Sequence, residues 1–387
     1  MSRDTLLIVT TSYPMAADGS EAAGAFVADF AEAMARHMPV RVVGPGIRAG
    51  REEGGSTVSV WRFAAGEKPL SLLSPSKPWH WPAIFLTLRS LRRQVFAAAK
   101  DGRVAHTLAL WALPSGWAAR ELQRARGVPY SVWALGSDIW SLGKLPIIRR
   151  LLRDVCKGAS GAYADGFQLA ADAEALSGRT FEFMPSCRRL DGVRTRPLAT
   201  EPPYRLLFLG RWHPNKGIDL LLDALDGLAD AEWTRIQEVH IAGGGPLQAL
   251  VHERVARLQS QQRPVRLSGY LDREQASIAL AEADRLLLPS RIESIPVVFS
   301  DAMAFGIPVV SMPVGDLPTL LAHGGGWLAN AVSAPAFALA LSECLSSTQN
   351  PVDISVIAGK FDLSAVVGRL AVSLTSADRD GRGNLIG

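Results

Sequence analysis

Short runs of apolar residues alternate along the chain with segments in which apolar residues recur at helical spacing. Residues 6–10 form a compact β-type run, residues 25–38 carry apolar side chains at helical spacing, and residues 40–43 form the next run. A strand, a helix and a second strand in this order make a βαβ unit, which requires a parallel sheet. Further β-type runs at residues 130–134 and 161–164 predict that the first half is a doubly wound α/β domain.

A second series of the same kind follows a proline-rich stretch. Residues 190–203 hold Gly192, Pro197, Pro202 and Pro203 and few large apolar residues, as is typical of a linker. Strands are predicted beyond it at residues 205–209, 239–242, 265–267, 285–288 and 309–311, and helices at 218–228, 273–283 and 298–305. We therefore expect two α/β domains, residues 1–195 and 204–358, joined by a linker at 196–203. Ligands are expected outside the carboxyl ends of their strands.

Composition supports two folded domains and adds a difference in charge. The chain has 387 residues, more than one ordinary core holds, and 48% of them are hydrophobic, which excludes wholesale disorder. Residues 1–200 hold 26 Lys and Arg against 17 Asp and Glu, a net charge of +9, whereas residues 201–387 hold 15 against 20, a net charge of −5. The basic first half favours an anionic partner such as phosphate or lipid headgroups.

Cysteine spacing and the length of the apolar runs indicate the cellular compartment of the protein. Cys156, Cys187 and Cys344 lie far apart and outside any CxxC or Cys/His cluster, which argues against a disulfide framework or a zinc site and for the reducing cytoplasm. The first apolar run is too short for a signal peptide or an anchor. The most membrane-like window, residues 295–314, is interrupted by prolines and a glycine, which favours a strand–helix–strand unit.

The loop from Gly210 to Gly217 joins a predicted strand to a predicted helix and contains Arg211 and Lys216. Two cations beside a helix N-terminus are suited to a diphosphate, although a solvated basic loop is the alternative interpretation. The turn from Gly243 to Pro246 has a similar place, where small residues let backbone approach a ligand, and a plain strand-to-helix turn explains it as well.

Glu293 and Asp301 bracket the start of the helix predicted after the strand at 285–288. The free N–H groups of a helix N-terminus favour phosphate, and carboxylates on either side accept hydrogen bonds from sugar or ribose hydroxyls. A ligand with phosphate at the helix N-terminus and hydroxyl groups at the two carboxylates would be a nucleotide sugar. The alternative is a capping Glu293 and an incidental Asp301.

Taken together, these segments resemble the GT-B glycosyltransferases of the retaining family 4, also called group 1. The match is strong through residues 204–320 and looser in the first half, at residues 11–14, 24–27, 111–116 and 136–139. The resemblance implies two Rossmann-like doubly wound domains facing across a cleft, with the donor bound by the second. It implies neither a metal nor another cofactor, because cations and helix dipoles offset the diphosphate charge.

The resemblance assigns roles residue by residue. Arg211 and Lys216 would bind the donor diphosphate, Glu293 would contact the transferred sugar, and Asp301 would take the ribose hydroxyls. Backbone N–H groups of Ser294, Ile295 and Val297 would help to hold the phosphates, whereas Pro296 has none to offer. Close approach is expected at four glycines: Gly24, Gly210, Gly243 and Gly245.

The chain also departs from the family pattern. Asp301 stands where the family has Glu, one methylene longer. Leu135 stands where the family commonly has a histidine, in the sequence Leu135-Gly136-Ser137-Asp138. Asp138 could orient the acceptor or the sugar, or could simply cap a turn. His106 or His213 could replace the missing histidine, or could be structural.

The acceptor side is predicted from basic and aromatic residues in the first half. Residues 78–93 and 145–157 combine cations with apolar faces, as suits an anionic membrane surface, and an ordinary helix with a solvated basic face is the alternative. Nucleic acid is not expected, because no binding motif accompanies the charge. The resemblance also implies a terminal helix at 359–375 that crosses back to the first domain. Residues 376–387, which include Asp378 and Asp380, are expected to be a disordered tail.

These patterns predict a metal-independent retaining glycosyltransferase that uses a nucleotide diphosphate sugar. Its acceptor would be a glycan or a lipid-linked saccharide, in cell-surface polysaccharide, lipopolysaccharide or glycolipid biosynthesis. The enzyme would be cytoplasmic, peripheral at the inner face of the plasma membrane. One alternative is a degenerate relative that binds a nucleotide or a partner without catalysis. A second is a nucleotide-sugar epimerase. The sequence specifies neither the sugar, the base nor the acceptor.

Overall fold

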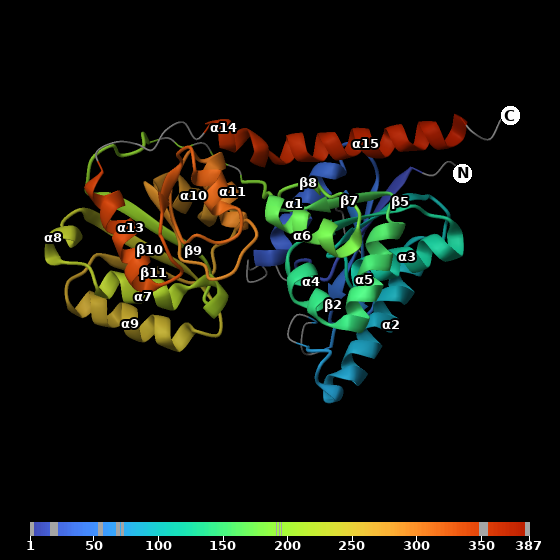
Figure 1. Cartoon of the computed structure of the whole chain (residues 1–387), viewed down its shortest axis with the longest axis horizontal. Coiled ribbons are helices and arrows are strands. Elements are labelled where there is room, and N and C mark those ends of the chain that lie inside the picture. The colour runs from blue at the N-terminus through green and yellow to red at the C-terminus, as the bar shows by residue number, and fades with distance from the viewer. Residues whose placement is uncertain are drawn as a thin grey trace. The chain divides into compact units, whose positions relative to one another are not determined.

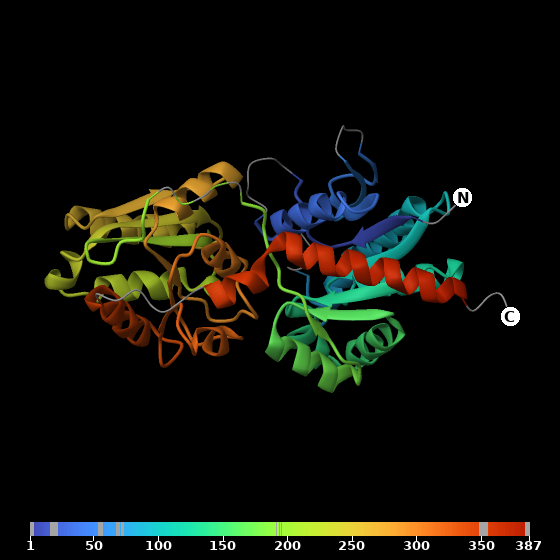
Figure 2. The same ribbon diagram turned by 90° about the horizontal axis from the view of Figure 1, so that it is seen from above.

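The computed structural model describes residues 4–15, 22–52, 57–66, 70, 73–190, 192, 194, 196–347 and 355–383. They form two compact units, each shown in Figures 1 and 2. The first unit holds Ala23–Pro185 together with the N-terminal strand and the C-terminal helix, and the second holds Ser186–Asp362. The boundary at Pro185 lies ten residues before the predicted one, at 195.

The first unit is built on an eight-stranded sheet. Its strands are β1 (Thr5–Val9), β2 (Val40–Gly46), β3 (Gly50–Arg51), β4 (Val58–Ala64), β5 (Val104–Leu110), β6 (Tyr130–Ala134), β7 (Gly161–Ala164) and β8 (Glu182–Phe183). They lie in the order β3-β4-β2-β1-β5-β6-β7-β8, and the short edge strand β3 alone is antiparallel to its neighbour in this described sheet. The sequence did not predict β4, because Ser59 and Arg62 interrupt its apolar run.

Helices cover both faces of this sheet. They are α1 (Ala22–Met34), α2 (Trp81–Ala98), α3 (Ser115–Arg126), α4 (Ser137–Trp140), α5 (Pro146–Gly158) and α6 (Phe167–Ser177), with 3-10 turns η2 (Pro78–His80) and η3 (Leu142–Lys144). One core lies between α2, α3 and the strands that carry Leu7 and Phe63. On α1, the Phe30 ring centroid lies 5.2 Å from that of Trp133 in β6.

The second unit has a fully parallel six-stranded sheet within the described residues. Its strands are β9 (Tyr204–Arg211), β10 (Ile236–Gly244), β11 (Val265–Ser268), β12 (Arg285–Leu288), β13 (Val309–Ser311) and β14 (Gly326–Leu328). The order β11-β10-β9-β12-β13-β14 is the doubly wound order of dinucleotide-binding domains. From β9 the chain adds β10 and β11 on one side of the sheet, and then β12, β13 and β14 on the other side. Ligands of such sheets bind at this switch point, between β9 and β12.

The helices of the second unit complete the βα alternation. They are η4 (Pro214–Lys216), α7 (Ile218–Asp226), α8 (Asp230–Trp233), α9 (Gln248–Ser260), α10 (Arg273–Glu282), α11 (Val297–Ala304), α12 (Leu317–Leu321), α13 (Ala334–Ser346), α14 (Ser355–Ala358) and η5 (Gly359–Phe361). The strands predicted at 285–288 and 309–311 and the helix predicted at 273–283 are confirmed to within one residue.

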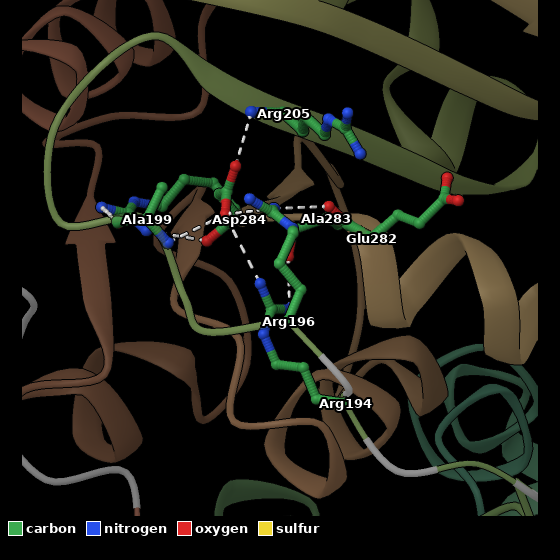
Figure 3. Close-up of polar contacts among 8 residues, drawn as sticks. Arg194, Arg196, Ala199, Arg205, Glu282, Ala283 and Asp284 are labelled. Carbon is green, nitrogen blue, oxygen red and sulfur yellow. Dashed lines mark hydrogen bonds and ion pairs between the residues drawn. The ribbon is translucent and has the colours of Figure 1, made fainter.

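The segment predicted as a linker is bound to the second unit by a buried carboxylate (Figure 3). Asp284, fully buried, accepts hydrogen bonds from Arg196 Nη2 at 2.6 Å, from the N–H of Ala199 at 3.0 Å and from the N–H of Arg205 at 2.9 Å. Arg194 Nη2 lies 3.4 Å from the same carboxylate. A scarcity of apolar residues suggests a free linker, but polar side chains anchor this one.

The C-terminal helix α15 (Leu363–Gly383) is longer than predicted. It continues through residues 376–383, where the sequence suggested a disordered tail, while residues 384–387 lie outside the described residues. Among the described helices, none combines the length and the apolar character needed to cross a bilayer.

Candidate functional site

Two loops of the second unit are held together at the switch point, one after β9 and one after β12. The guanidinium of Arg291 bonds both carboxylate oxygens of Asp219, at 2.7 and 2.6 Å, and its Nη1 donates to the carbonyl of Pro214 at 2.6 Å. The backbone N–H of Arg291 donates to the carbonyl of Asn215 at 2.8 Å. Hydrogen bonds from Arg291 lower the pKa of Asp219. Sequence reasoning missed this pair, which fixes the loop of Arg211 and Lys216 against the loop of Glu293.

A glycine lets the two loops approach this closely. Gly217 has φ +67°, and a Cβ placed on it would lie 1.8 Å from the carbonyl oxygen of Pro289. Any side chain at position 217 would separate the loops or strain the backbone. The glycine that ends the predicted phosphate loop is therefore a packing requirement of the site.

The structure pairs one of the two predicted cations with the predicted sugar-binding carboxylate. Lys216 Nζ forms an ion pair with Glu293 Oε1, and the two side chains are 35% and 17% exposed. Arg211 ends β9 and is exposed. The pKa of His213 is lowered first by partial burial and then by the charges of Arg211 and Lys216. His213 Nδ1 accepts the N–H of Asn215 at 3.1 Å, which makes this histidine a cap of η4.

The start of α11 adds hydrogen-bond donors beside Glu293. Ser294 is buried, and its hydroxyl has no hydrogen-bond partner among the described residues. The first N–H groups of an α-helix have no acceptor within the helix, and α11 begins at Val297 directly after Pro296. Ile295, between Ser294 and Pro296 in the sequence, is buried as well. These donors follow directly on Glu293, the partner of Lys216, and the Ser294 hydroxyl is a donor that the sequence did not predict.

Three of the four predicted close-approach glycines meet protein backbone. At Gly243, with φ +148°, a Cβ would lie 1.9 Å from the carbonyl oxygen of Gly210. At Gly245 it would lie 2.8 Å from the carbonyl oxygen of Trp212, and at Gly24, in the first unit, 2.9 Å from Pro14 N. Gly210 has only ordinary contact with the Phe208 ring, at 3.6 Å. The glycines at the end of β10 are thus packed against the end of β9 and the residue that follows it, Trp212.

Asp301 lies in α11 and is buried and paired with Arg188. Arg188 Nε lies 3.2 and 3.0 Å from the two carboxylate oxygens, and Nη2 forms an ion pair with Oδ2. Burial raises the pKa of Asp301, and the charge of Arg188 opposes that rise. The neighbouring Ser300 hydroxyl donates to the carbonyl of Ser186 at 3.1 Å. Both oxygens predicted to meet ribose therefore contact Arg188, a residue that sequence reasoning missed, and the ribose role stays a prediction.

Asp138 lies in the first unit and connects two loops. Its Oδ2 accepts the N–H of Ala112 at 2.6 Å, and its Oδ1 accepts those of Leu135 at 3.3 Å and Ile139 at 3.2 Å. Complete burial raises the pKa of Asp138 to about 6, against the effect of these N–H groups. The carboxylate joins the loop after β5 to the loop after β6, as a turn-capping aspartate does. A role toward acceptor or sugar stays a prediction.

His106 lies within β5. Its Nε2 is 2.9 Å from the hydroxyl of Ser131 on β6, and burial lowers its pKa to about 4. A neutral imidazole held between two strands has a structural role. Within the described ranges no group of three His, Cys, Asp or Glu side chains is arranged to hold a metal ion.

Comparison with known proteins identifies the second unit. Residues 203–347, which contain the site, match the family model described as glycosyl transferases group 1. This segment is therefore similar to group 1 glycosyltransferases. The chain is 27% identical to TuaC of Bacillus subtilis, named for teichuronic acid biosynthesis, over 60% of this chain and 59% of TuaC. It is 33% identical to the amylovoran biosynthesis glycosyltransferase AmsK of Erwinia amylovora, over 40% of this chain and 39% of AmsK. The chain thus spans about three fifths or less of these curated relatives.

Solved structures show the fold of the whole chain. Sucrose-phosphate synthase from Thermosynechococcus elongatus superposes with a TM-score of 0.70 at 18% identity, over 98% of this chain and 100% of that one. Anabaena HepE, solved with UDP and glucose, gives a TM-score of 0.68 at 18% identity, over 95% and 99%. The chain has the GT-B fold, which confirms the predicted fold class.

Proposed function

We propose that the protein is a retaining glycosyltransferase that moves a sugar from a nucleotide diphosphate donor to a glycan or lipid-linked acceptor. The observation that carries the proposal is the pairing of Lys216 with Glu293 beside the unpaired Ser294 hydroxyl and the start of α11. It lies at the switch point of a doubly wound sheet, within the segment that matches the group 1 family. Sheets of this type bind nucleotides at that place.

Each of these groups has a function in sugar transfer. Arg211 and Lys216 would offset the donor diphosphate, with free N–H groups of α11 and the Ser294 hydroxyl donating to phosphate oxygens. Once Lys216 turns to the phosphate, the Glu293 carboxylate can accept hydrogen bonds from the hydroxyls of the transferred sugar. The leaving diphosphate would take the proton of the acceptor hydroxyl, so that no protein base is needed and Leu135 can stand where relatives have histidine. Cations and the helix N-terminus would offset the diphosphate charge in place of a metal ion.

The proposed substrates follow from the names of relatives and neighbours. TuaC and AmsK are named for polysaccharide biosynthesis, and the structural neighbour WaaB is named a lipopolysaccharide outer core galactosyltransferase. HepE was solved with UDP and glucose. We infer a role in cell-surface polysaccharide or lipopolysaccharide biosynthesis, with UDP-sugars as the first donors to test.

The test begins with a panel of UDP-, GDP- and ADP-sugars in a thermal shift assay, because a ligand that binds only the native state raises its Tm. Transfer and donor hydrolysis are then measured with the best donor for the wild type, Glu293→Gln, and Glu253→Gln as the control on an exposed face of α9. Glu293→Gln should keep nucleotide affinity and lose transfer. Full turnover of Glu293→Gln would contradict the role of Glu293. A wild type that binds donor without transfer or hydrolysis would favour the non-catalytic alternative.

The first unit offers a surface for an acceptor that resides in a membrane. Trp79, Trp81 and Phe85 are 72%, 59% and 64% exposed in η2 and the first turns of α2, and Arg89 and Arg93 are exposed farther along α2. Figure 1 shows this end of α2 projecting from its unit. Aromatic side chains with cations next to them suit the interface of an anionic bilayer. We propose that this end of α2 binds the membrane peripherally.

Vesicle sedimentation tests the membrane surface. The wild type should sediment with phosphatidylglycerol vesicles and much less with phosphatidylcholine vesicles. Trp79→Ser/Phe85→Ser should abolish sedimentation, and Leu339→Ser, an exposed apolar position on α13, should not. Equal sedimentation of the double variant and the wild type would refute this surface.

A further inference from the structure

A pocket lies on the first unit, at the amino ends of the sheet strands. Ligands of α/β sheets usually bind at the opposite end. Its volume is about 340 Å³, and its lining includes Arg41, Arg51, Ser59, Trp61, Lys100 and Asp101. Arg41 and Ser59 are the second residues of β2 and β4, and Lys100 follows the C-terminus of α2. The pocket is therefore at the amino ends of parallel strands, whereas ligands of doubly wound sheets bind at the carboxyl ends. Neither the segment that matches the group 1 family nor the proposed donor site includes it.

One cation of this pocket is neutralised and two are not. Arg41 Nη1 and Nη2 bond the two carboxylate oxygens of Asp101 at 2.8 and 2.6 Å, and Nη1 also donates to the carbonyl of Ala98 at 2.6 Å. These bonds hold the pKa of Asp101 down, at about 2, so its carboxylate stays ionised. Arg51 and Lys100 are exposed and form no ion pair within the described part of the chain. The pocket thus presents a fixed carboxylate and two cations free to bind an anion.

Trp61 supplies an apolar wall between these charges. Its inner side packs against the core under α2, and the guanidinium carbons of Arg41 and Arg51 lie 5.4 and 5.2 Å from its ring centroid. The ring and the two guanidinium groups stacked on it make one flat wall for the C–H groups of a sugar ring, a fixed carboxylate accepts hydroxyl protons, and Arg and Lys bind a carboxylate. Inorganic phosphate would use the cations but not the ring, and a neutral sugar would leave both cations unused.

We propose that this pocket binds an acidic sugar unit, a hexuronate of the polysaccharide on which the enzyme acts. This inference rests on the proposed function for the source of the ligand, since a polysaccharide acceptor supplies such units in a chain. A site remote from the carboxyl ends of the strands would hold an earlier unit of that chain while its growing end is extended. Holding the chain there would raise the effective concentration of its end at the site of transfer.

Titration calorimetry of the full-length chain tests the pocket. The wild type should bind trigalacturonate, with maltotriose and inorganic phosphate each at least tenfold weaker. Arg51→Ala/Lys100→Ala should weaken trigalacturonate binding tenfold or more, because each charged hydrogen bond contributes about a factor of ten. Arg36→Ala/Arg48→Ala removes two exposed cations of the same unit and should bind as the wild type does.

Three results would overturn the proposal: no trigalacturonate binding at millimolar concentration, unchanged affinity in Arg51→Ala/Lys100→Ala, or phosphate binding that is as tight as that of the saccharide and is weakened by the same double substitution. The titration needs no donor, so it is independent of transfer. A protein that transfers sugar but does not bind trigalacturonate refutes the pocket alone. A protein that binds trigalacturonate but transfers no sugar refutes the proposed function alone.

Discussion

Replacing Arg188 by alanine should show how much the stability of the second unit depends on the charged partner of the buried Asp301. The carboxylate of Asp301 is buried, and Arg188 is its charged partner on both oxygens. In Arg188→Ala the carboxylate stays buried without a counter-ion, which typically costs about 3–5 kcal/mol. The alternative for the protein is to protonate it. From an ordinary pKa of 3.8, protonation at pH 7 costs about 4 kcal/mol, so the two estimates agree.

The same reasoning gives a pH dependence with a definite sign. In the variant the folded-state pKa of Asp301 rises further above its unfolded value, so the unfolded state releases its proton first as the pH rises. The stability lost by Arg188→Ala should therefore be small near pH 4 and grow toward pH 7. At pH 5 the cost of protonation falls to about 1.6 kcal/mol.

Urea unfolding at pH 5 and pH 7 measures both quantities, with the buried Trp212 and Trp233 as reporters in the second unit. Arg257→Ala is the control, since Arg257 is 52% exposed in its ion pair with Asp226 and should contribute at most about 1 kcal/mol. A loss below about 1 kcal/mol at pH 7, or one that does not change with pH, would refute the reasoning. The double variant Arg188→Met/Asp301→Leu should regain most of the stability, because it buries no charge.

Two more variants examine the donor site. Lys216→Ala should weaken binding of the nucleoside diphosphate by about 1.5–3 kcal/mol, the contribution of a charged hydrogen bond, and unchanged calorimetric affinity would contradict the phosphate assignment. Gly217→Ala should lower the urea midpoint far more than Gly306→Ala, since both glycines have positive φ but only the Cβ at 217 would meet the carbonyl of Pro289. Equal losses would show that the loops can move apart without cost.

The strands that carry the donor site could be predicted from the sequence because they are short apolar runs that end at turn-forming residues. Leu286, Leu287 and Leu288 are buried on both faces of a parallel sheet, and such strands appear as continuous apolar runs. The first unit shows the limit of this reading. β4 carries Ser59 and Arg62 among its apolar residues, and Arg62 is buried because its Nη2 donates to the carbonyl of Pro14 at 2.7 Å and its Nη1 to that of Pro45 at 2.9 Å.

Long-range polar pairs explain most of what the sequence did not predict in the site. Arg188 and Asp301 are 113 positions apart, and Arg291 and Asp219 are 72 apart. A local pattern records where a carboxylate lies in a helix or loop, but not which distant cation reaches it. Asp301 was accordingly assigned to a ligand, whereas the structure pairs it with the protein's own arginine. The motif left the pairings within this surface open.

These pairings change how charge should be assigned to function. The half with a net charge of −5 carries the proposed donor site, and there each motif carboxylate has a cation beside it, Lys216 for Glu293 and Arg188 for Asp301. An incoming diphosphate would compete with Glu293 for Lys216, so part of its binding energy replaces an existing ion pair. That exchange frees the Glu293 carboxylate only when phosphate is present. Recognition of the sugar by Glu293 would thus be coupled to recognition of the diphosphate by Lys216, which disfavours free sugars that lack the nucleotide.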